Sequence, residues 1–379
     1  MSVKSFIVPK LAQRMLSKKR LDKQRAQFER TRMKAGADHL VEFFHDPTDP
    51  YSQLLEKVLP DFQNKYDVNL AIHLVSPPDD GAAPEREKLK DYAKMDAMRL
   101  AKKARIDFQI QDNAPAENTS VADARREELG HYLGGMLYYG GEWYWGLDRL
   151  HYLEIRLADL GLERTGAADT AIYTPPIVPT GRGNTGAELH WYLSFRSPYT
   201  AIVPDRVKKL ADAYSADLRL RFVLPMVMRG LPVPPAKKKY IPLDTAREAR
   251  RMGVPFGKVL DPVGKPVELG YSLIPWARAQ GRDYEYVQNW LKAVWSEGID
   301  AGRPKGLRKI VERAGLVWNE AKDVLGNNDW RAEAEANQKE MMEHGIWGVP
   351  SFRVGDTVTW GQDRLWVVEH ALQKLESKS

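Results

Sequence analysis

The absence of cysteine restricts the chemistry that this chain can perform. None of its 379 residues is a cysteine. A disulfide framework, a thiolate zinc or iron–sulfur site, a cysteine nucleophile and a C-x-x-C redox motif are therefore excluded. The best placed alternative is the hydroxyl of Ser197, because Ser197-Pro198 directly follows an alternating apolar run. Serine before a proline in the first helical turn predicts a helix N-terminus. This preference explains the pair structurally. A catalytic role of the hydroxyl is a second hypothesis.

A second polar cluster combines metal-ligand residue types at His45, Asp46 and Asp49. Each aspartate precedes a proline, a combination that favours turns and helix caps, and we prefer that explanation to a metal site. The other histidines have no ligand-like spacing, so we predict no metal. Residues 181–186 satisfy G-x-G-x-x-G, but they precede a predicted strand and do not link a strand to a helix. We therefore reject nucleotide binding by this loop.

An internal repeat indicates which elements position these residues. Residues 40–52 and 188–200 each combine an apolar run with a small polar residue and then Pro-Tyr-Ser or Pro-Tyr-Thr. The sequence Trp-Gly-x-Asp-Arg-Leu occurs at 145–150 and again at 360–365. Asp49 precedes Trp145 by 96 residues and Ser197 precedes Trp360 by 163, so the second copy carries 67 additional residues. The chain thus contains two unequal versions of one fold.

The second copy has the pattern of a small mixed α/β sheet with a helical insertion. Residues 188–195 and 217–224 are predicted strands, and a helix should begin at Ser197. A hairpin should turn at Gly355-Asp356, and a last helix should start at Asp363. The hairpin strands are predicted at 351–354 and 357–360, and the insertion helices near 243–252, 283–296, 305–314 and 329–344. The first copy repeats this order with a shorter insertion at about residues 84–131.

Charge separates the N-terminal segment from the rest of the chain. Lys and Arg number 57 against 51 Asp and Glu, yet residues 1–34 alone carry a net charge of +9 and the remainder −3. We predict a helix over Leu11–Met33, because neither Gly nor Pro interrupts it. The segment has no apolar run long enough for a secretory signal or a membrane span. Three roles stay open: a solvated or domain-packing helix, contact with an acidic surface such as a membrane or RNA, and a mitochondrial presequence.

The motifs together resemble a known superfamily. The small-polar-Pro-Tyr motif after the first strand, Gly348-Val349-Pro350-Ser351 before the hairpin, and residues 360–364 are similar to the DsbA-like thioredoxin superfamily. Within it, the sequence resembles the branch of 2-hydroxychromene-2-carboxylate isomerases and kappa-class glutathione transferases. Further similar segments lie at 234–240, 253–256 and 294–300. The resemblance covers nearly all of residues 187–377, covers residues 38–160 more weakly, and does not extend to the basic arm.

This resemblance implies an α/β fold of two tandem thioredoxin-like, DsbA-type domains with helical insertions, preceded by a basic N-terminal helix. A length of 379 residues also argues for two domains. We expect the basic helical arm at 1–37 and a degenerate thioredoxin-like domain at 38–162. A Pro- and Gly-containing linker at 163–186 should precede a DsbA-like, isomerase-like domain at 187–379.

The resemblance also implies the site residues. In this branch a serine replaces the nucleophilic cysteine of thioredoxins, so Ser197 is the expected catalytic residue and should hydrogen-bond the thiol of glutathione, the implied co-substrate. A helix N-terminus and a hydroxyl donor both favour the thiolate, the reactive form of a thiol. Four further residues are expected to bind glutathione. These are Val349 with the cis-proline Pro350, and Gln362 with Asp363, which match the pair that grips the γ-glutamyl end.

The expected substrate pocket contains residues from several segments. Arg196, beside Ser197, could supply positive charge, which is our own inference and not a feature of the family. Two positions depart from the family pattern. Leu231 and Pro232 follow Gly230 where asparagine is common, and Tyr271-Ser272 stands where an Asn-Ser pair often lines the pocket. The pocket residues that we predict are Arg196, Tyr199, Tyr240, Tyr271 and Ser272.

The first copy has lost the corresponding site residues. Asp49 replaces the serine, Gly135 takes the position of Pro350, and Leu147 replaces Gln362. A carboxylate at this position would repel a thiolate. We therefore expect a structural or interface role for the first copy.

The leading hypothesis is a cytoplasmic, glutathione-dependent isomerase or transferase that acts on a small conjugated or electrophilic substrate. The protein would supply positioning and thiolate stabilisation, while the nucleophile would arrive with the borrowed thiol. The alternative is a non-catalytic thioredoxin-like binding protein with a degenerate site. A thiol–disulfide oxidoreductase is excluded, because the chain has no sulfur nucleophile. The sequence leaves open a homodimer and a nucleic-acid or membrane contact of the arm.

Overall fold

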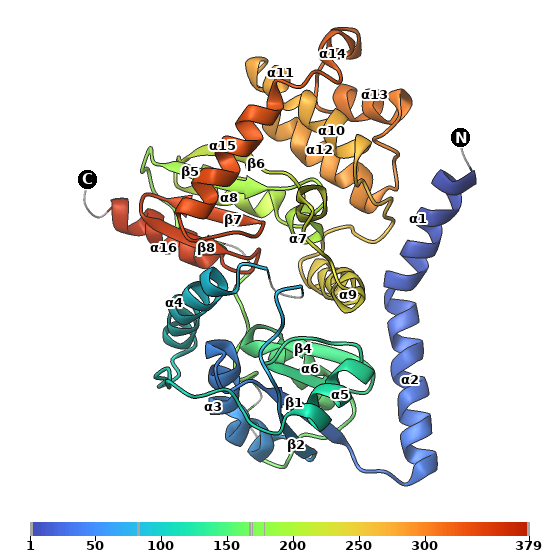
Figure 1. Cartoon of the computed structure of the whole chain (residues 1–379), viewed down its shortest axis with the longest axis vertical. Coiled ribbons are helices and arrows are strands. Elements are labelled where there is room, and N and C mark those ends of the chain that lie inside the picture. The colour runs from blue at the N-terminus through green and yellow to red at the C-terminus, as the bar shows by residue number, and fades with distance from the viewer. Residues whose placement is uncertain (1–2, 82–83, 167, 169, 178, 377–379) are drawn as a thin grey trace. The chain divides into compact units, whose positions relative to one another are not determined.

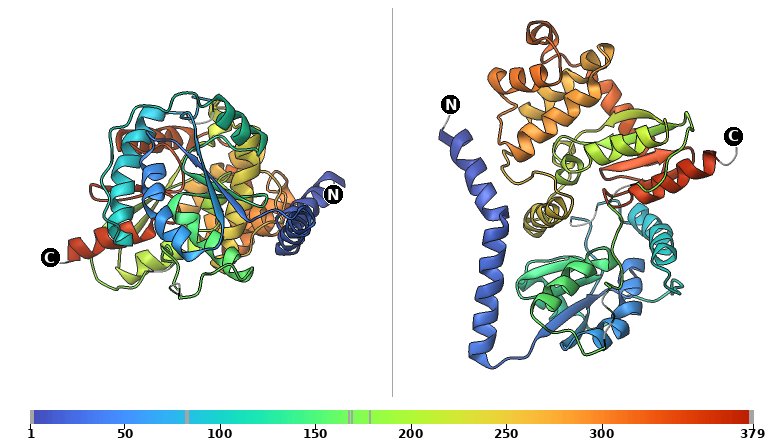
Figure 2. Two further views of the ribbon diagram at one scale, coloured as in Figure 1. Left: turned by 90° about the horizontal axis from the view of Figure 1, so that it is seen from below. Right: turned by 180° about the vertical axis from the view of Figure 1, so that it is seen from behind.

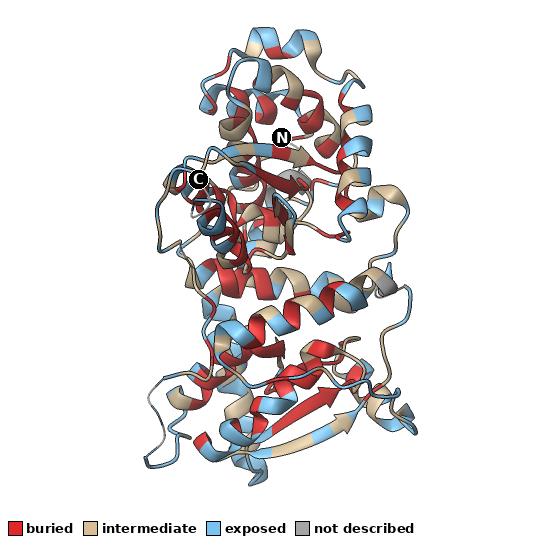
Figure 3. Ribbon diagram, turned by 90° about the vertical axis from the view of Figure 1, so that its left-hand side faces the viewer, coloured by how far each residue is buried: buried red, intermediate tan, exposed pale blue. Residues whose placement is uncertain are grey.

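The computed structural model describes residues 3–81, 84–166, 168, 170–177 and 179–376, and it divides the chain into two compact units. The N-terminal unit comprises Lys18–Pro175 and Val233–Tyr240. The C-terminal unit comprises Met1–Ser17, Pro176–Pro232 and Ile241–Ser379. Each unit contains its own sheet, and buried residues concentrate on the strands and on the helix faces that cover them (Figures 1 and 3).

The N-terminal unit is built on a four-stranded mixed sheet with the strand order β2-β1-β3-β4. The central strand β1 (Leu40–His45) pairs in parallel with β2 (Asn69–Leu74) and antiparallel with β3 (Met136–Tyr139). β3 forms a hairpin with β4 (Glu142–Trp145). The helices of this unit are α2 (Lys18–Ala35), α3 (Pro50–Lys65), α4 (Arg86–Ala104), α5 (Ser120–Glu128) and α6 (Gly146–Asp159).

The C-terminal unit repeats this sheet with the order β6-β5-β7-β8. β5 (Glu188–Leu193) pairs in parallel with β6 (Asp217–Phe222) and antiparallel with β7 (Ser351–Val354), which forms a hairpin with β8 (Thr357–Trp360). The N-terminal helix α1 (Val3–Leu16) clusters with this unit, and α9 (Pro235–Arg251) enters it at Ile241. The other helices are α7 (Pro198–Ala201), α8 (Pro204–Ala213), the short 3-10 helix η1 (Met226–Arg229), α10 (Lys265–Ser272), α11 (Ile274–Ala279), α12 (Asp283–Ser296), α13 (Pro304–Arg313), α14 (Trp318–Val324), α15 (Trp330–Glu343) and α16 (Leu365–Glu376).

The two sheets have the same register, residue for residue. The pairs of β1 with β2 recur in β5 and β6 at positions 148 higher, as Leu40↔Asn69 becomes Glu188↔Asp217. The pairs of β3 with β4 recur in β7 and β8 at positions 215 higher, as Met136↔Trp145 becomes Ser351↔Trp360. The difference of 67 is the expected surplus of the second copy. It falls between α9 and α15, where the C-terminal unit has helices α10 to α14.

Large aromatic side chains fill the core of the C-terminal unit. Trp191, Phe195 and Trp290 are fully buried, and the rings of Phe195 and Trp290 stack with centroids 3.9 Å apart. Gly270 is required beside them, because a Cβ there would lie 2.6 Å from Nε1 of Trp290. The core therefore fixes the end of β5, from which the chain continues to Ser197.

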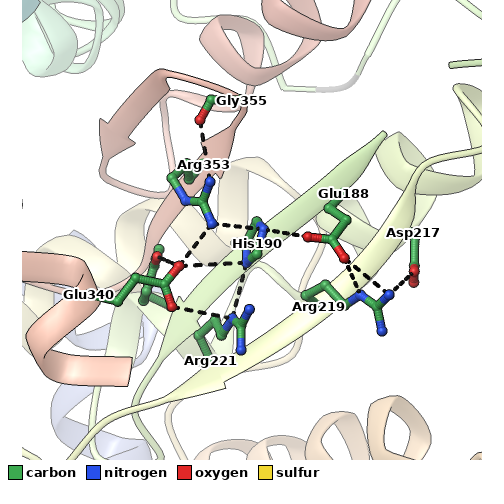
Figure 4. Close-up of polar contacts among 9 residues, drawn as sticks. Glu188, His190, Asp217, Arg219, Arg221, Glu340, Arg353 and Gly355 are labelled. Carbon is green, nitrogen blue, oxygen red and sulfur yellow. Dashed lines mark hydrogen bonds and ion pairs between the residues drawn. The ribbon is translucent and has the colours of Figure 1, made fainter. Parts of the chain in front are cut away.

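A charged cluster covers the face of the second sheet that points away from the aromatic core. We call Glu188, His190, Arg221, Glu340 and Arg353 the outer-face network (Figure 4). Arg353 donates to Glu340 over 2.8 Å, and Nε of Arg221 donates to Nδ1 of His190 over 3.0 Å. Burial, Arg353 and Arg221 together lower the pKa of His190. The network ties α15 to the sheet.

Several expected elements are confirmed and others need correction. The hairpin strands and the helix at 283–296 match β7, β8 and α12, whereas β5 and β6 end two residues earlier than predicted. The basic segment is two helices, α1 and α2, which Ser17 separates, and not one helix over Leu11–Met33. Figure 2 shows both helices from two further sides. The predicted linker at 163–186 includes residues 167, 169 and 178, which lie outside the described residues.

The second helix of the arm packs on the N-terminal unit. Arg25 of α2 forms a two-pronged ion pair with Glu142 at 2.7 and 2.9 Å. Phe28 lies edge-on to Tyr139 with ring centroids 5.6 Å apart. Within the described part of the chain, no helix is long and apolar enough to cross a membrane.

Candidate functional site

The hydroxyl of Ser197 lies at the turn between β5 and α7. Ser197 has extended backbone angles of −92° and 117°, and its side chain caps α7 by accepting a hydrogen bond from the amide of Thr200 over 3.2 Å. The same hydroxyl donates to the carbonyl oxygen of Val349 over 3.2 Å. The peptide bond between Val349 and Pro350 is cis. The structure therefore brings together Ser197, Val349 and Pro350, three of the predicted site residues.

The helix that Ser197 caps is a single turn. α7 ends at Ala201, and a new helix, α8, starts at Pro204. This corrects the expectation of a full helix behind Ser197, so a macrodipole contributes little to anion binding there. A second hydroxyl lies on the same turn, because Thr200 is fully buried and its hydroxyl has no hydrogen-bond partner among the described residues. The turn therefore has one partly exposed hydroxyl, that of Ser197, and one fully buried hydroxyl, that of Thr200.

Gln362 is not free to grip a ligand with its side chain. It is almost fully buried, its amide nitrogen donates to Glu248 over 2.6 Å, and its amide oxygen accepts from Arg206. Both ends of the amide are thus occupied inside the protein. The predicted glutathione contact of this side chain needs correction. The start of the last helix also needs correction, because α16 begins at Leu365 and Asp363 lies in the turn before it.

Two predicted pocket residues, Arg196 and Tyr199, already contact carboxylates of the protein. The guanidinium of Arg196 forms a two-pronged pair with Asp261, with both distances 2.8 Å. The hydroxyl of Tyr199 donates to Asp244 over 2.8 Å. The charge of Arg196 is therefore partly neutralised, and Tyr199 fastens the Ser197 turn to α9.

Two of the remaining three pocket predictions, Tyr271 and Ser272, need correction, whereas that of Tyr240 stays a prediction. Tyr271 is fully buried, its hydroxyl donates to the carbonyl of Val223 over 2.7 Å, and burial raises its pKa to about 12. The hydroxyl of Ser272 donates to the carbonyl of Leu269 over 2.9 Å. Both are core residues, and neither can line an open pocket. Tyr240 clusters with the N-terminal unit, where its ring lies edge-on to His131 at 4.9 Å.

Asp49 occupies in the N-terminal unit the position that Ser197 has in the C-terminal unit. It precedes Ser197 by 148 residues, has nearly the same backbone angles of −89° and 117°, and caps α3 through the amides of Tyr51 and Ser52. Burial and, secondarily, the charge of Asp46 raise the pKa of Asp49 to about 7. Its carboxylate abuts Gly135, whose missing Cβ would lie 3.1 Å from Oδ2.

The turn and cap explanation for the histidine and aspartate cluster is confirmed. Asp46 accepts from the amide of Thr48 over 2.9 Å, as in an Asp-Pro turn, and Asp49 is a helix cap. His45 pairs with the hydroxyl of Ser52 over 2.8 Å. Among the described residues, no group of histidine and carboxylate side chains has the arrangement of a metal site.

Sequence reasoning missed the polar residues beneath the site. Arg206, Asp244 and Glu248 are buried and contact predicted site residues. The signal that could have found them is the repeat itself. Because the offset of 148 continues from β1 through α4, the bond between Tyr199 and Asp244 has a counterpart between Tyr51 and Asp96, also 2.8 Å long.

A comparison with protein-family models finds a match in the C-terminal unit. The family model of the DsbA-like thioredoxin domain matches residues 188–373. Among curated proteins, 2-hydroxychromene-2-carboxylate isomerase of Pseudomonas putida is 26% identical over 196 residues, which cover 49% of this chain and 94% of the relative. The enzyme of the same name from Pseudomonas sp. (strain C18) is 24% identical over 190 residues, which cover 48% of this chain and 88% of the relative.

The solved structures include a protein with the same name. A selenomethionine structure of 2-hydroxychromene-2-carboxylate isomerase is 25% identical to this chain and has a TM-score of 0.41. It covers 49% of this chain, and 95% of its own length is matched.

Proposed function

Because residues 188–373 are a DsbA-like thioredoxin domain, we propose that the chain is a glutathione-dependent isomerase or transferase with its active site at Ser197. Its substrate would be a small conjugated or electrophilic molecule. The names of the two curated relatives support an isomerase. The absence of cysteine from the sequence requires that the reactive sulfur come from a second molecule.

The single observation that carries this proposal is the position of the Ser197 hydroxyl. It lies on the turn after the central strand and within 3.2 Å of the carbonyl oxygen of Val349. The neighbouring Thr200 hydroxyl is buried without a partner among the described residues. That hydroxyl has no exposed surface, so Ser197 is the residue of this turn whose hydroxyl could serve a thiolate.

Three residues of the site would each contact a different part of glutathione. Ser197 would turn its hydroxyl proton from Val349 to the sulfur, because a charge-assisted hydrogen bond is stronger than one to a neutral carbonyl. This exchange would free the carbonyl of Val349 to accept an N–H group of the peptide-like ligand. Asp363 would pair with the α-amino group of the γ-glutamyl end.

Glutathione, when bound, supplies a thiolate that can add to a conjugated carbon, permit rotation about the former double bond and leave unchanged. A free thiol has a pKa of roughly 8.5, so less than a tenth of it is ionised near neutral pH. The hydroxyl of Ser197 would raise that fraction by stabilising the anion. The protein thus contributes a lowered thiol pKa and orientation, without a nucleophile of its own.

Calorimetry tests the proposal directly. We expect saturable binding of glutathione at millimolar or lower concentration and weaker binding of S-methylglutathione, whose sulfur cannot become a thiolate. Ser197→Ala should abolish this preference for the free thiol. If neither ligand binds to the wild-type chain, the proposal is wrong and a non-catalytic binding protein becomes the better account.

A further inference from the structure

Helix α1 exposes a stripe of large apolar side chains to solvent. Ile7, Val8, Leu11 and Met15 are between 36% and 57% exposed. Every other helix of the described residues exposes at most one large apolar side chain. Single apolar residues on a surface are common, whereas a contiguous group of them marks an interaction site. The stripe on α1 therefore indicates a docking surface.

The spacing of these residues places them on one side of the helix. Because an α-helix has about 3.6 residues per turn, Ile7, Leu11 and Met15 follow one another along the axis and Val8 lies beside them. The four side chains span an arc of about 100° around the helix. The exposed cations Lys10 and Arg14 border this arc on one side. The outward face of α1 thus combines apolar side chains with positive charge.

The opposite side of α1 already packs on the C-terminal unit. Pro9 is buried so close to Gly298 that a Cβ on that glycine would lie 2.5 Å from Cβ of Pro9. Leu16 lies against Gly257 in the same way, at 3.5 Å. The guanidinium of Arg250 donates to the carbonyl oxygen of Leu16 over 3.1 Å. The apolar stripe is therefore not the face by which α1 packs on its own chain.

The charge near the stripe has a single sign. The sequence contains no Asp or Glu before Asp22. Residues 7–20 contain five basic residues, namely Lys10, Arg14, Lys18, Lys19 and Arg20. An apolar stripe accompanied only by cations is complementary to a surface that is anionic on the outside and apolar beneath. A bilayer with acidic lipids has this chemistry.

Two other arrangements fit the same face less well. A nucleic acid would pair with the cations through its phosphates, but it would leave the apolar side chains in water. Insertion across the bilayer does not fit either, because α1 has 14 residues. Such a helix is about 21 Å long, whereas the hydrocarbon core is about 30 Å thick. The remaining arrangement is a helix that lies along the membrane surface.

We propose that the outward face of α1 docks on the surface of a membrane that contains acidic lipids. The helix lies in the plane of the interface, with Ile7, Leu11 and Met15 at the boundary between head groups and acyl chains. Arg14 contacts the lipid phosphates. The chain is then a peripheral membrane protein that α1 holds at the surface. This inference does not depend on the proposed function.

Sedimentation of the full chain with lipid vesicles tests the proposal. We expect binding to vesicles of equal parts phosphatidylcholine and phosphatidylserine, and much weaker binding to phosphatidylcholine alone. Leu11→Ser should lower the partition coefficient by roughly tenfold, because a large apolar side chain no longer enters the interface. Arg14→Gln should lower it a few-fold, and only for the acidic vesicles.

A matched control lies on another helix of the same unit. Leu243 of α9 is 41% exposed, so Leu243→Ser makes the same substitution at a similar position and should bind vesicles as the wild type does. Both serine variants should keep a Tm near that of the wild type, because neither leucine is buried.

A fluorescent label reports insertion directly. Because the sequence has no cysteine, Met15→Cys can carry one environment-sensitive fluorophore at a single site. Its emission should shift to shorter wavelength when acidic vesicles are added, as the label leaves water for the interface. The same label at Leu243→Cys should show no shift.

Several results would overturn this inference. The first is a wild-type chain that does not bind the acidic vesicles. Equal binding by Leu11→Ser and Leu243→Ser would show that another surface holds the lipid, and an unshifted label at Met15→Cys on bound vesicles would show a purely electrostatic contact. Binding of an RNA oligonucleotide that Arg14→Gln weakens, without any binding of vesicles, would assign the face to nucleic acid. None of these assays contains glutathione, so the proposed function stands or fails separately.

Discussion

The hydroxyl of Ser197 lies 3.2 Å from the carbonyl oxygen of Val349, although the two residues are 152 positions apart in the chain. The turn after β5 carries the hydroxyl, and the segment leading into β7 carries the carbonyl. Because β5 and β7 are hydrogen-bonded neighbours, the sheet register brings both groups to one end of the sheet. The hydroxyl also caps α7, so the group to which we assign the chemistry has a structural role as well.

Replacing Ser197 by alanine should reduce activity far more than stability. Loss of one preorganised donor to a reacting anion lowers turnover by roughly 100-fold, whereas loss of an N-cap side chain costs about 1 kcal/mol of unfolding free energy. Glutathione-dependent turnover and thermal unfolding of Ser197→Ala would test this. A variant that retains more than half of the wild-type turnover would show that the hydroxyl has no part in the reaction.

Ser197→Asp separates the cap from the chemistry. Aspartate is as good an N-cap as serine, and Asp49 performs that role at the equivalent position of α3. We expect a Tm close to that of the wild type. A carboxylate beside a thiolate raises its energy, so the variant should bind glutathione only in the thiol form. Equal thiolate binding by Ser197→Asp and the wild type would contradict the assignment.

Asp49 should make the stability of the N-terminal unit depend on pH. Its pKa is about 7 in the folded chain, above the usual 3.8. The folded state therefore holds a proton that the unfolded state releases, and the free energy of unfolding falls as pH rises from about 4 to about 7. Asp49→Asn keeps a capping side chain without the ionisation. At pH 8 we expect its Tm to exceed that of the wild type by a few degrees.

The control for this pH dependence lies on the same helix. Asp61 of α3 is exposed, so Asp61→Asn should leave the pH profile of Tm unchanged. If Asp49→Asn follows the wild-type profile between pH 5 and pH 8, the carboxyl of Asp49 is ionised throughout that range and the prediction is wrong.

The two equivalent tyrosine–aspartate bonds should contribute similarly to stability. Tyr199 donates to Asp244 and Tyr51 donates to Asp96, each over 2.8 Å, and both aspartates are almost fully buried. Removal of a hydroxyl that serves a buried carboxylate costs about 1–3 kcal/mol. We expect Tyr199→Phe and Tyr51→Phe each to lower the denaturant midpoint. If only one of them does so, the bond is not a common feature of the two units.

The sequence predicted the parts of the fold that depend on local chemistry. Ser197-Pro198 predicts a helix start, and Gly355-Asp356 predicts the hairpin turn, because each signal lies within a few residues. The break of the helix after α7 was missed, although Pro204 marks the start of α8. Alternation of apolar residues predicts β5, and the turn at Gly355-Asp356 predicts β7 and β8 on either side of it. The predicted strands at β5 and β6 extend two residues beyond the observed ends.

The buried polar residues could not be predicted from local patterns. Arg206 and Gln362 are 156 positions apart, and Gln362 and Glu248 are 114 apart. Nothing near any one of them indicates the other two. Tyr271 was assigned to a pocket by resemblance, but its neighbours in the fold are core aromatics such as Phe195 and Phe222. These three buried polar residues could have been located by comparing the two copies position by position, because the first copy has apolar residues at the equivalent positions.

The pKa of the glutathione thiol in complex with the chain tests the central claim most directly. Ultraviolet absorbance of the thiolate, followed as a function of pH with the wild type and with Ser197→Ala, measures it. We predict that the wild type lowers the thiol pKa by one unit or more from its free value of roughly 8.5 and that Ser197→Ala restores most of the difference. A bound thiol with the same pKa in both proteins would contradict the role of Ser197.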